Sequence, residues 1–391
     1  MISASVGVGT GPDAYTAGEE ACRHALGEMP KERAHALFVF GSVALDQDKL
    51  IEGVSSLSGD ALLIGCSSAG EISSEGFSAE KSVVVMAIAS DQVQFCGAVG
   101  HHILWNPRRA GEECASGLQY ASHGYTHSAL AFLDIISGNG DLTLSGFLNR
   151  LGGNVPVFGG AAGDDMLFFQ TFQYLKDKTY SGSIVGMGLS GNFTTAQVTM
   201  HGFLPIGIER IVTKSEGTTL YELDGKPAAS IYKEYFGEEH LSELHEGLLP
   251  SITVSYPLGV FLKDSDEALL RNPIFIDKKG AMTFTAAIPQ GAEIRLMISD
   301  IERDLEVTEL AAQSLLKKLN GKKPKAALVV NSMARKKMLG ARADEEIEII
   351  QRVLGRDVPF VGFYSYAQIG ERSKGEVDLQ NGAISIWALA E

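Results

Sequence analysis

One pattern occurs three times along the 391-residue chain: an apolar strand, a helix-like stretch, a second apolar strand and then a turn with glycine. The three copies span residues 36–71, 129–165 and 326–370, and the key glycines are Gly65, Gly159 and Gly362. Short apolar runs on either side of helical periodicity are typical of βαβ units. The sequence therefore predicts an α/β fold of repeated βαβ-type units, with each glycine turn at the C-terminal end of a buried strand.

Further strands are predicted outside these copies. Residues 82–89 with 93–100, and 183–189 with 195–201, are separated by short polar turns and are predicted to form hairpins, which gives mixed sheets. A β-rich insertion is expected at residues 260–298, followed by a helix over residues 308–319. Pro205 and Gly207 mark a change of element, so we expect two packed domains, residues 1–210 and 211–391.

The charge balance excludes several classes of partner. The chain carries 48 acidic against 33 basic residues, a net charge of −15, which repels nucleic acid and anionic membrane surfaces. No apolar run approaches the length of a membrane-spanning helix, and the N-terminus lacks the pattern of a signal peptide. The four cysteines show no CxxC spacing, which fits a reducing compartment. We therefore expect a cytoplasmic protein without membrane insertion.

Five segments together resemble the FIST family, in the family's order: residues 65–71, 159–165, 201–207, 221–228 and 362–370. The first half is similar to its N-terminal domain and the second to its C-terminal domain. The resemblance implies a sensory protein that binds a small ligand, such as an amino acid or metabolite. It also implies a separate signalling partner, such as a histidine kinase, a chemoreceptor or a cyclic-dinucleotide enzyme. No output domain is visible in the sequence.

The glycine-bearing turns supply the candidate ligand-binding residues, because glycine lets backbone amides approach a ligand closely. These residues are Gly65, Cys66, Ser67, Ser68, Glu71, Gly160, Asp164, Asp165, Asn331, Arg335, Tyr364 and Tyr366. The structural alternatives are a tight turn for the first segment, a helix cap or solvated turn for the aspartates, and a solvated basic turn around Arg335. The family usually has a cysteine and Gly-Arg at residues 331–335 and Gly-Glu-Ile-Gly at residues 367–370, so this chain departs from its pattern there.

An enzyme that uses Cys66 or the Asp164–Asp165 pair is the competing class of function. Cys66 has no base near it in the sequence, and the serines beside it do not form GxSxG. The glycines near the N-terminus match neither GxGxxG nor a P-loop. We therefore expect a protein without a catalytic role.

Haem is the alternative cofactor, because a two-domain, stand-alone subset of the family binds haem, senses nitric oxide and signals to a histidine kinase. No CxxCH motif selects an iron ligand among the nine histidines. His201 is the preferred ligand if haem binds, because it ends an apolar strand and precedes Phe203 and Leu204. A hydrogen-bonded structural histidine is the other interpretation of His201.

Overall fold

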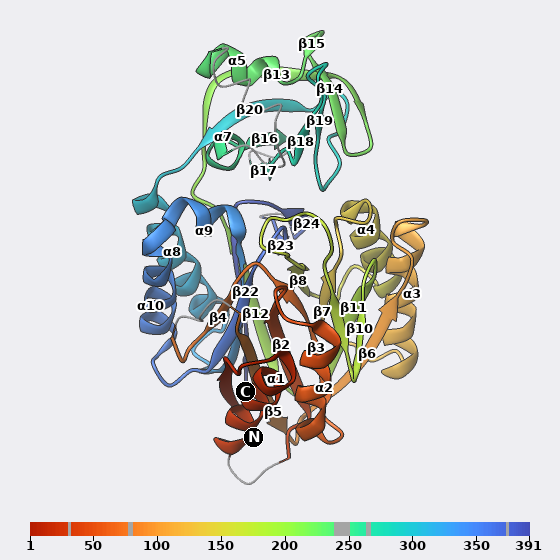
Figure 1. The fold of residues 1–391 in the computed structure, drawn as a ribbon, viewed down its shortest axis with the longest axis vertical. Helices are drawn as coiled ribbons and strands as arrows, with labels where there is room; N and C mark the ends of the chain where they lie inside the picture. Colours follow the sequence, from red (N-terminus) through yellow and green to blue (C-terminus); the bar gives the residue numbers. More distant parts are fainter. Residues whose placement is uncertain (30–32, 77–80, 238–250, 263–266, 373–374) are drawn as a thin grey trace.

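The computed structural model describes residues 1–29, 33–76, 81–237, 251–262, 267–372 and 375–391. Three similar α/β units form a body, and a β-rich cap sits over one end of it, away from both termini (Figure 1). The fold is therefore a mixed α/β protein in two packed parts. None of its described helices is both long enough and apolar enough to cross a bilayer.

Each unit contains two parallel strands, joined by a helix, with an antiparallel strand on one side. The elements of the first unit are β1 (Ile2–Gly9), α1 (Ala14–Gly27), β2 (Ala36–Ser42), α2 (Gln47–Ser58), β3 (Leu62–Ser68) and β5 (Val83–Ser90). Those of the second unit are β6 (Val93–Gly100), α3 (Pro107–Ala121), β7 (Ser128–Leu133), α4 (Gly140–Leu151), β8 (Val157–Ala161) and β11 (Ile184–Gly191).

The third unit is interrupted by the cap. Its elements are β12 (Thr194–Met200), α8 (Ile301–Lys318), β21 (Pro324–Ser332), α9 (Met333–Leu339), α10 (Ala343–Leu354), β22 (Phe360–Ser365) and β25 (Ile384–Ala390). Most of the longer helices of the body begin at an Asp or Asn whose side chain accepts a backbone N–H of the first turn. The predicted helix at 308–319 starts earlier, because Asp300 caps it.

Short strands are exchanged between the units in a cycle. Strand β4 (Glu71–Ser73) leaves the first unit and pairs with β22 of the third. Strand β9 (Gln173–Leu175), with β10 (Lys178–Tyr180), leaves the second unit and pairs with β3 of the first. Strand β23 (Gln368–Glu371), with β24 (Val377–Gln380), leaves the third unit and pairs with β8 of the second. Each sheet is thus completed by another unit, which locks the three together.

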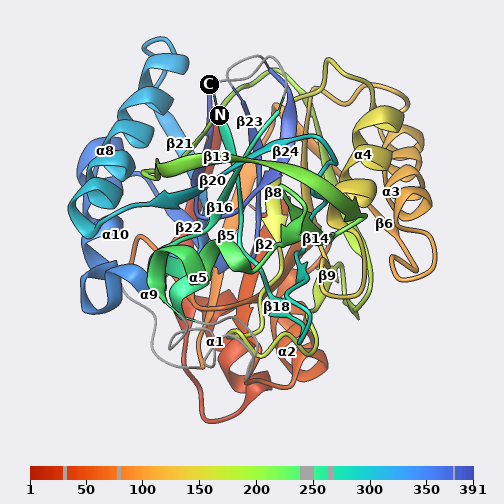
Figure 2. The same cartoon turned by 90° about the horizontal axis from the view of Figure 1, so that it is seen from above.

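The main core lies where the three sheets face one another. Phe40 of β2, Phe132 of β7 and Phe363 of β22 meet there, with ring centroids 4.6–5.8 Å apart, so every unit contributes one ring. All three side chains are fully buried. The helices cover the outer faces of the sheets (Figures 1 and 2).

The three glycines of the sequence repeat lie at equivalent places inside β3, β8 and β22, each opposite the first parallel strand of its unit. A Cβ on Gly65, Gly159 or Gly362 would come within 1.7–1.9 Å of a carbonyl oxygen of that strand. The predicted repeat is confirmed, although the glycines lie within the strands and not in the turns after them. Close approach of two backbones is what requires glycine there.

The two hairpins predicted from short turns are wrong. Strand β5 pairs with β1 and β2, whereas β6 pairs with β11 in another sheet. Strand β11 likewise pairs with β7 and β6, whereas β12 pairs with β25. Because β5 and β11 already have a neighbour on each side, the short turns that follow them carry the chain to the next sheet.

The cap comprises residues 204–298 and confirms the predicted β-rich insertion. Its elements are β13 (Leu204–Glu216), β14 (Thr219–Leu223), β15 (Lys226–Pro227), α5 (Ser230–Phe236), α7 (Ser251–Ser255), β16 (Leu258–Phe261), β17 (Ala268–Arg271), β18 (Phe275–Ile276), β19 (Met282–Thr283) and β20 (Glu293–Ile298). It has a hydrophobic core of its own. The division expected between residues 210 and 211 falls inside β13 and stays a prediction.

Candidate functional site

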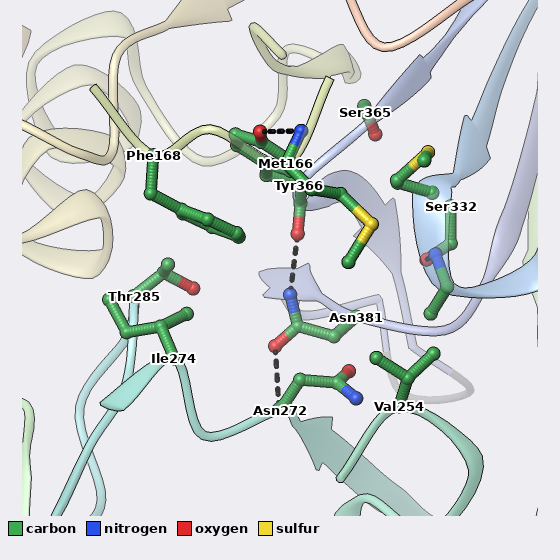
Figure 3. A pocket seen from close by; sticks show the side chains of 12 residues that line it. Met166, Phe168, Val254, Asn272, Ile274, Thr285, Ser332, Ser365, Tyr366 and Asn381 are labelled. Atoms are coloured by element: carbon green, nitrogen blue, oxygen red, sulfur yellow. Dashed lines mark hydrogen bonds between the residues drawn. The ribbon is translucent and has the colours of Figure 1, made fainter. Parts of the chain in front are cut away.

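A pocket lies between the cap and the carboxyl ends of the parallel strands of the third unit (Figure 3). The body lines it with Met166, Phe168, Ser332, Met333, Ala334, Ser365, Tyr366 and Asn381. The cap lines it with Val254, Asn272, Ile274 and Thr285. The carboxyl edge of parallel strands is where open α/β sheets usually bind ligands. The cap covers that edge and forms the opposite side of the pocket.

The pocket is small in this structure. It holds ≈ 410 Å³ of empty space, its open mouth included, and the centre of a water molecule can reach ≈ 40 Å³ of it. Since about 10–15 Å³ of such volume holds one water, there is room for about three water-sized groups. A larger ligand fits only if residues of the pocket wall move.

Asp164 organises the loop that supplies Met166 and Phe168. Its buried carboxylate accepts the N–H groups of Phe168 (3.0 Å), Phe169 (2.7 Å) and Gln170 (2.9 Å), and also the hydroxyl of Tyr366. These bonds saturate the carboxylate. Asp164 thus shapes the wall of the pocket without lining it.

The same loop is strained. Asp165, Met166 and Phe168 have φ values of 54°, 64° and 49°, in the left-handed region that residues other than glycine seldom adopt. Tyr366 holds the loop, because its hydroxyl accepts the N–H of Met166 at 2.7 Å and its ring stacks on Phe168 with centroids 4.5 Å apart. Strain that persists beside a pocket is typical of functional sites.

A hydrogen-bonded bridge joins the cap to the body at the pocket. The side-chain amide of Asn381 donates to the carbonyl of Tyr366 at 2.7 Å, and its oxygen accepts the N–H of Asn272 at 3.4 Å (Figure 3). Farther along the interface, Arg271 of the cap donates to the carbonyl of Leu379 at 2.8 Å and lies 3.7 Å from Asp141.

The first predicted turn packs against its neighbours and not around the pocket. The Ser67 hydroxyl donates to the carbonyl of Gly163 at 2.8 Å, and Ser68 and Ser82 both donate to the Glu71 carboxylate. Burial raises the pKa of Glu71 above its usual range. This turn therefore joins units together through buried polar contacts.

The first and third predicted turns meet at Tyr364. The N–H of Ala69 donates to the carbonyl of Tyr364 at 2.9 Å, and the N–H of Tyr364 donates to the carbonyl of Gly70 at 2.8 Å. The ammonium of Lys336 lies over the Tyr364 ring, 5.1 Å from its centroid, and donates to Ala69 at 2.9 Å. Burial raises the pKa of Tyr364. The predicted residues Ser68, Glu71 and Tyr364 are thus brought together.

Arg335, predicted as an anion site, lies in a buried network inside the third unit. Its guanidinium pairs with Asp304 at 3.0 Å and with Glu346, and donates to Thr308 at 2.9 Å. Asn331 donates to the other oxygen of Glu346 at 2.7 Å. Arg335 is fully buried, and its guanidinium links α9 to α8 and α10 and does not face the pocket.

The remaining candidates also lie away from the pocket. Cys66 is fully buried in the main core, and burial raises its pKa well above the usual range. Gly65 and Gly160 lie within β3 and β8, where a Cβ would clash with backbone or side-chain atoms. Asp165 is exposed and does not line the pocket. Tyr366 is the one predicted site residue that does.

The surroundings of His201 do not fit a haem. Its Nε2 lies 3.3 Å from the carbonyl oxygen of Ala268, and its Nδ1 is enclosed by protein atoms. The groove beside it carries ionisable side chains, namely Glu267, Lys318, Glu371 and Arg372. Burial lowers the pKa of His201 below its usual range. A haem iron needs an imidazole nitrogen that faces an apolar slot, whereas here Nε2 faces the Ala268 carbonyl and Nδ1, which has no hydrogen-bond partner among the described residues, is buried among protein atoms.

Most of the pocket was missed by sequence reasoning. Ser332 ends a buried strand, Met333 and Ala334 directly follow it, and Ser365 ends another strand, so that position was a usable signal. The residues that the cap contributes lie on the short helix α7 and next to short strands, and their contact with the body depends on tertiary packing. Nothing in the local sequence around Asn272 or Thr285 marks it as a site.

Comparison with known proteins places the chain among uncharacterized relatives. It is 27% identical over 293 residues to an uncharacterized protein of Methanocaldococcus jannaschii, which covers 69% of this chain and 56% of that protein. The chain thus spans little more than half of that relative. It is 25% identical over 380 residues to an uncharacterized protein of Mycobacterium tuberculosis, which covers 93% and 94% of the two chains.

Solved structures resemble the chain only distantly. Cyanuric acid hydrolase from A. caulinodans aligns with a TM-score of 0.38 and 9% identity, over 100% of this chain and 99% of that one. A chorismatase aligns with a TM-score of 0.35 and 9% identity, over 100% and 98%.

Family comparison gives a clear result. Residues 35–226 match the FIST N domain and residues 228–371 match the FIST C domain, so the two matches cover most of the chain. FIST domains are sensory domains of signal transduction. The chain belongs to the FIST family.

Proposed function

We propose that this protein is a ligand-responsive sensor whose small ligand binds in the pocket between cap and body and thereby changes the position of the cap. The observation that carries the proposal is the composition of the pocket, because the cap supplies Asn272 and Thr285 while the body supplies Ser332 and Tyr366. A ligand that contacts both parts has a different affinity for each arrangement of cap and body. That difference is what shifts a conformational equilibrium.

The connections of the cap favour such movement. The chain enters the cap after β12 and leaves it before α8, so two short segments hold it covalently to the body. Beside the pocket, the bridge through Asn381 includes a long bond of 3.4 Å, which costs little to break. Small domains joined in this way commonly close or open by hinge motion.

Helix α9 offers a route from the pocket to the outer surface. Met333 and Ala334 line the pocket at its start, and the next residue, Arg335, ties it to α8 and α10. A shift of α9 therefore has to move both helices. We propose that the outer faces of α8 and α10 present the signal to a separate protein, which in this family is expected to be a histidine kinase, a chemoreceptor or a cyclic-dinucleotide enzyme.

We also propose that the protein acts without a catalytic step of its own. The thiol of Cys66 is enclosed by apolar side chains, and the Asp164 carboxylate is saturated by loop N–H groups and a tyrosine hydroxyl. Neither group can reach a substrate in the pocket. Haem-based nitric oxide sensing is not proposed, because Nε2 of His201 faces a carbonyl, its Nδ1 is buried, and the groove beside it carries ionisable side chains.

Retention of a metabolite tests the proposal. The protein is dialysed against a deproteinised cell extract, washed and denatured, and the released compounds are identified by mass spectrometry. Ala334→Phe fills the pocket from α9, whereas Lys337→Phe puts the same ring on an exposed position of the same helix. We expect a compound that is retained by the parent protein and by Lys337→Phe and lost in Ala334→Phe. Equal retention by all three proteins would place the ligand elsewhere.

A further inference from the structure

We infer that the ligand of this pocket is a compact, uncharged, planar compound that carries a hydrogen-bond acceptor next to a donor, as an aromatic carboxamide does. The inference rests on the proposed function, since it concerns the same pocket. It departs from the amino acids expected from the family resemblance, because an amino acid brings two charges into the site.

Charge is the first constraint. None of the residues lining the pocket, as far as the structure describes it, has an ionisable acidic or basic side chain that is charged near neutral pH. Arg335 lies one residue beyond the lining, but its guanidinium is already paired with Asp304 and Glu346. A carboxylate, phosphate or ammonium group would therefore enter without a counter-charge. Burying an unpaired charge is far more costly than burying a neutral polar group.

Shape is the second constraint. The rings of Phe168 and Tyr366 stack face to face with an angle of 11° between their planes, so they form a rigid aromatic pair in the wall of the pocket. Met166 and Met333 add flexible thioether side chains that adapt to a flat ligand. Aromatic compounds pack well against such walls. The small volume favours a ligand of about one ring, and even one ring fits only if the walls of the pocket move apart.

Polar groups of the lining that can still bond to a ligand supply the third constraint. The Thr285 hydroxyl forms no hydrogen bond with any described residue, although the residue is only 5% exposed, and its oxygen points into the pocket (Figure 3). Ser332 accepts the N–H groups of Ala334 and Gly382, both at 3.2 Å, so its hydroxyl hydrogen stays available.

Asn272 completes this set from the cap. Its amide nitrogen donates to the carbonyl of Thr253 at 2.8 Å, while its side-chain oxygen accepts from none of the described residues. Two hydroxyl donors and one amide acceptor therefore face the cavity, from the cap and from the body. A ligand with an adjacent carbonyl and N–H can bond to both sides and hold them in one arrangement.

Paired probes test the ligand class. Benzamide and benzoate have nearly the same shape but differ in charge, and cyclohexanecarboxamide keeps the amide but lacks the flat ring. Their dissociation constants are measured by ligand-observed NMR titration on the full chain, on Ala334→Phe and on Lys337→Phe. We expect benzamide to bind at millimolar or lower concentration and benzoate to bind at least about 10-fold more weakly.

The variants locate the binding. Benzamide affinity should be lost in Ala334→Phe and kept in Lys337→Phe. Thr285→Val removes one hydroxyl at nearly constant volume and should weaken benzamide about 2- to 10-fold. Cyclohexanecarboxamide should bind more weakly than benzamide, because it has no flat ring to stack against the aromatic pair of Phe168 and Tyr366.

The outcomes separate this inference from the proposed function. Benzoate that binds as tightly as benzamide, with binding lost in Ala334→Phe, overturns the uncharged class and leaves the pocket as the sensor site. Absence of benzamide binding also overturns the ligand class, whereas the retention experiment still decides the function. Benzamide that binds Ala334→Phe unchanged overturns the ligand class, because the compound then binds outside the pocket, and the retention experiment again decides the function.

Discussion

Removal of the Arg335 guanidinium is the sharpest test of how the third unit is held together. In the parent protein, this fully buried group pairs with Asp304 and Glu346 and also donates to the carbonyl of Asp304 at 2.7 Å. Arg335→Met keeps the length of the side chain but leaves two carboxylates buried without a counter-charge. Breaking a buried pair in this way costs about 3–5 kcal/mol. We expect a loss of that size in the free energy of unfolding.

Urea denaturation followed by circular dichroism measures this loss. Arg352→Met is the matched control, because Arg352 is 63% exposed and its pair with Glu309, at 3.0 Å, should contribute about 1 kcal/mol or less. The deficit of Arg335→Met should shrink as the pH falls from 7, since protonation removes the unpaired charges. Burial already raises the pKa of Asp304 in the parent protein. A loss below about 1 kcal/mol, or a deficit that grows on acidification, would refute the reasoning.

Three further changes probe other parts of the account. Gly362→Ala should cost about 3 kcal/mol or more in unfolding free energy, because its Cβ would lie 1.9 Å from a carbonyl oxygen of β21. Gly27→Ala is the control, because its Cβ meets nothing within 4 Å, and it should be neutral or stabilising. Equal effects of the two substitutions would contradict the backbone contact. Cys66→Ser should lower the free energy of unfolding by about 1–3 kcal/mol, although the two side chains are similar in size, because the hydroxyl is buried in an apolar core. The thiol of native Cys66 should also resist alkylation, and rapid labelling would show that it is accessible. Burial raises the pKa of Glu71 above 4.5, so its contribution to stability is complete below pH 4.5 and is lost as the pH rises through the folded pKa. Relative to Glu71→Gln, the parent protein should therefore become more stable between pH 7 and pH 4.5 in urea titrations. A stability difference that stays constant with pH would show an unperturbed carboxyl.

The local pattern of the sequence predicts the repeated units well, but not how they join. Residues 36–64 carry the apolar periodicity of strand, helix and strand, and the structure follows it. The turn after Ser90 looks like a hairpin turn, yet it leads into another sheet, because both neighbours of β5 come from elsewhere in the first unit. The exchange of β4, β9 and β23 between units also has no signal in the local sequence, since it depends on packing between distant segments.

The same limit applies to the site. Tyr366 could be identified because it follows a glycine-bearing strand, and it does line the pocket. Arg335 looked like a free basic group, because its acidic partners Asp304 and Glu346 lie on other helices, 31 and 11 residues away. Thr285 and Asn272 carry no local signal of function. Their role depends on the position of the cap over the third unit.

Hydrogen exchange with the retained compound tests the central claim most directly, because it shows where the ligand binds and whether the cap responds. The full chain is compared with and without the compound by mass spectrometry. We expect slower exchange in residues 164–170, 272–285, 332–334 and 365–366, together with altered exchange where the cap joins the body. Protection confined to the groove beside His201, or to surfaces remote from the cap, would contradict the account.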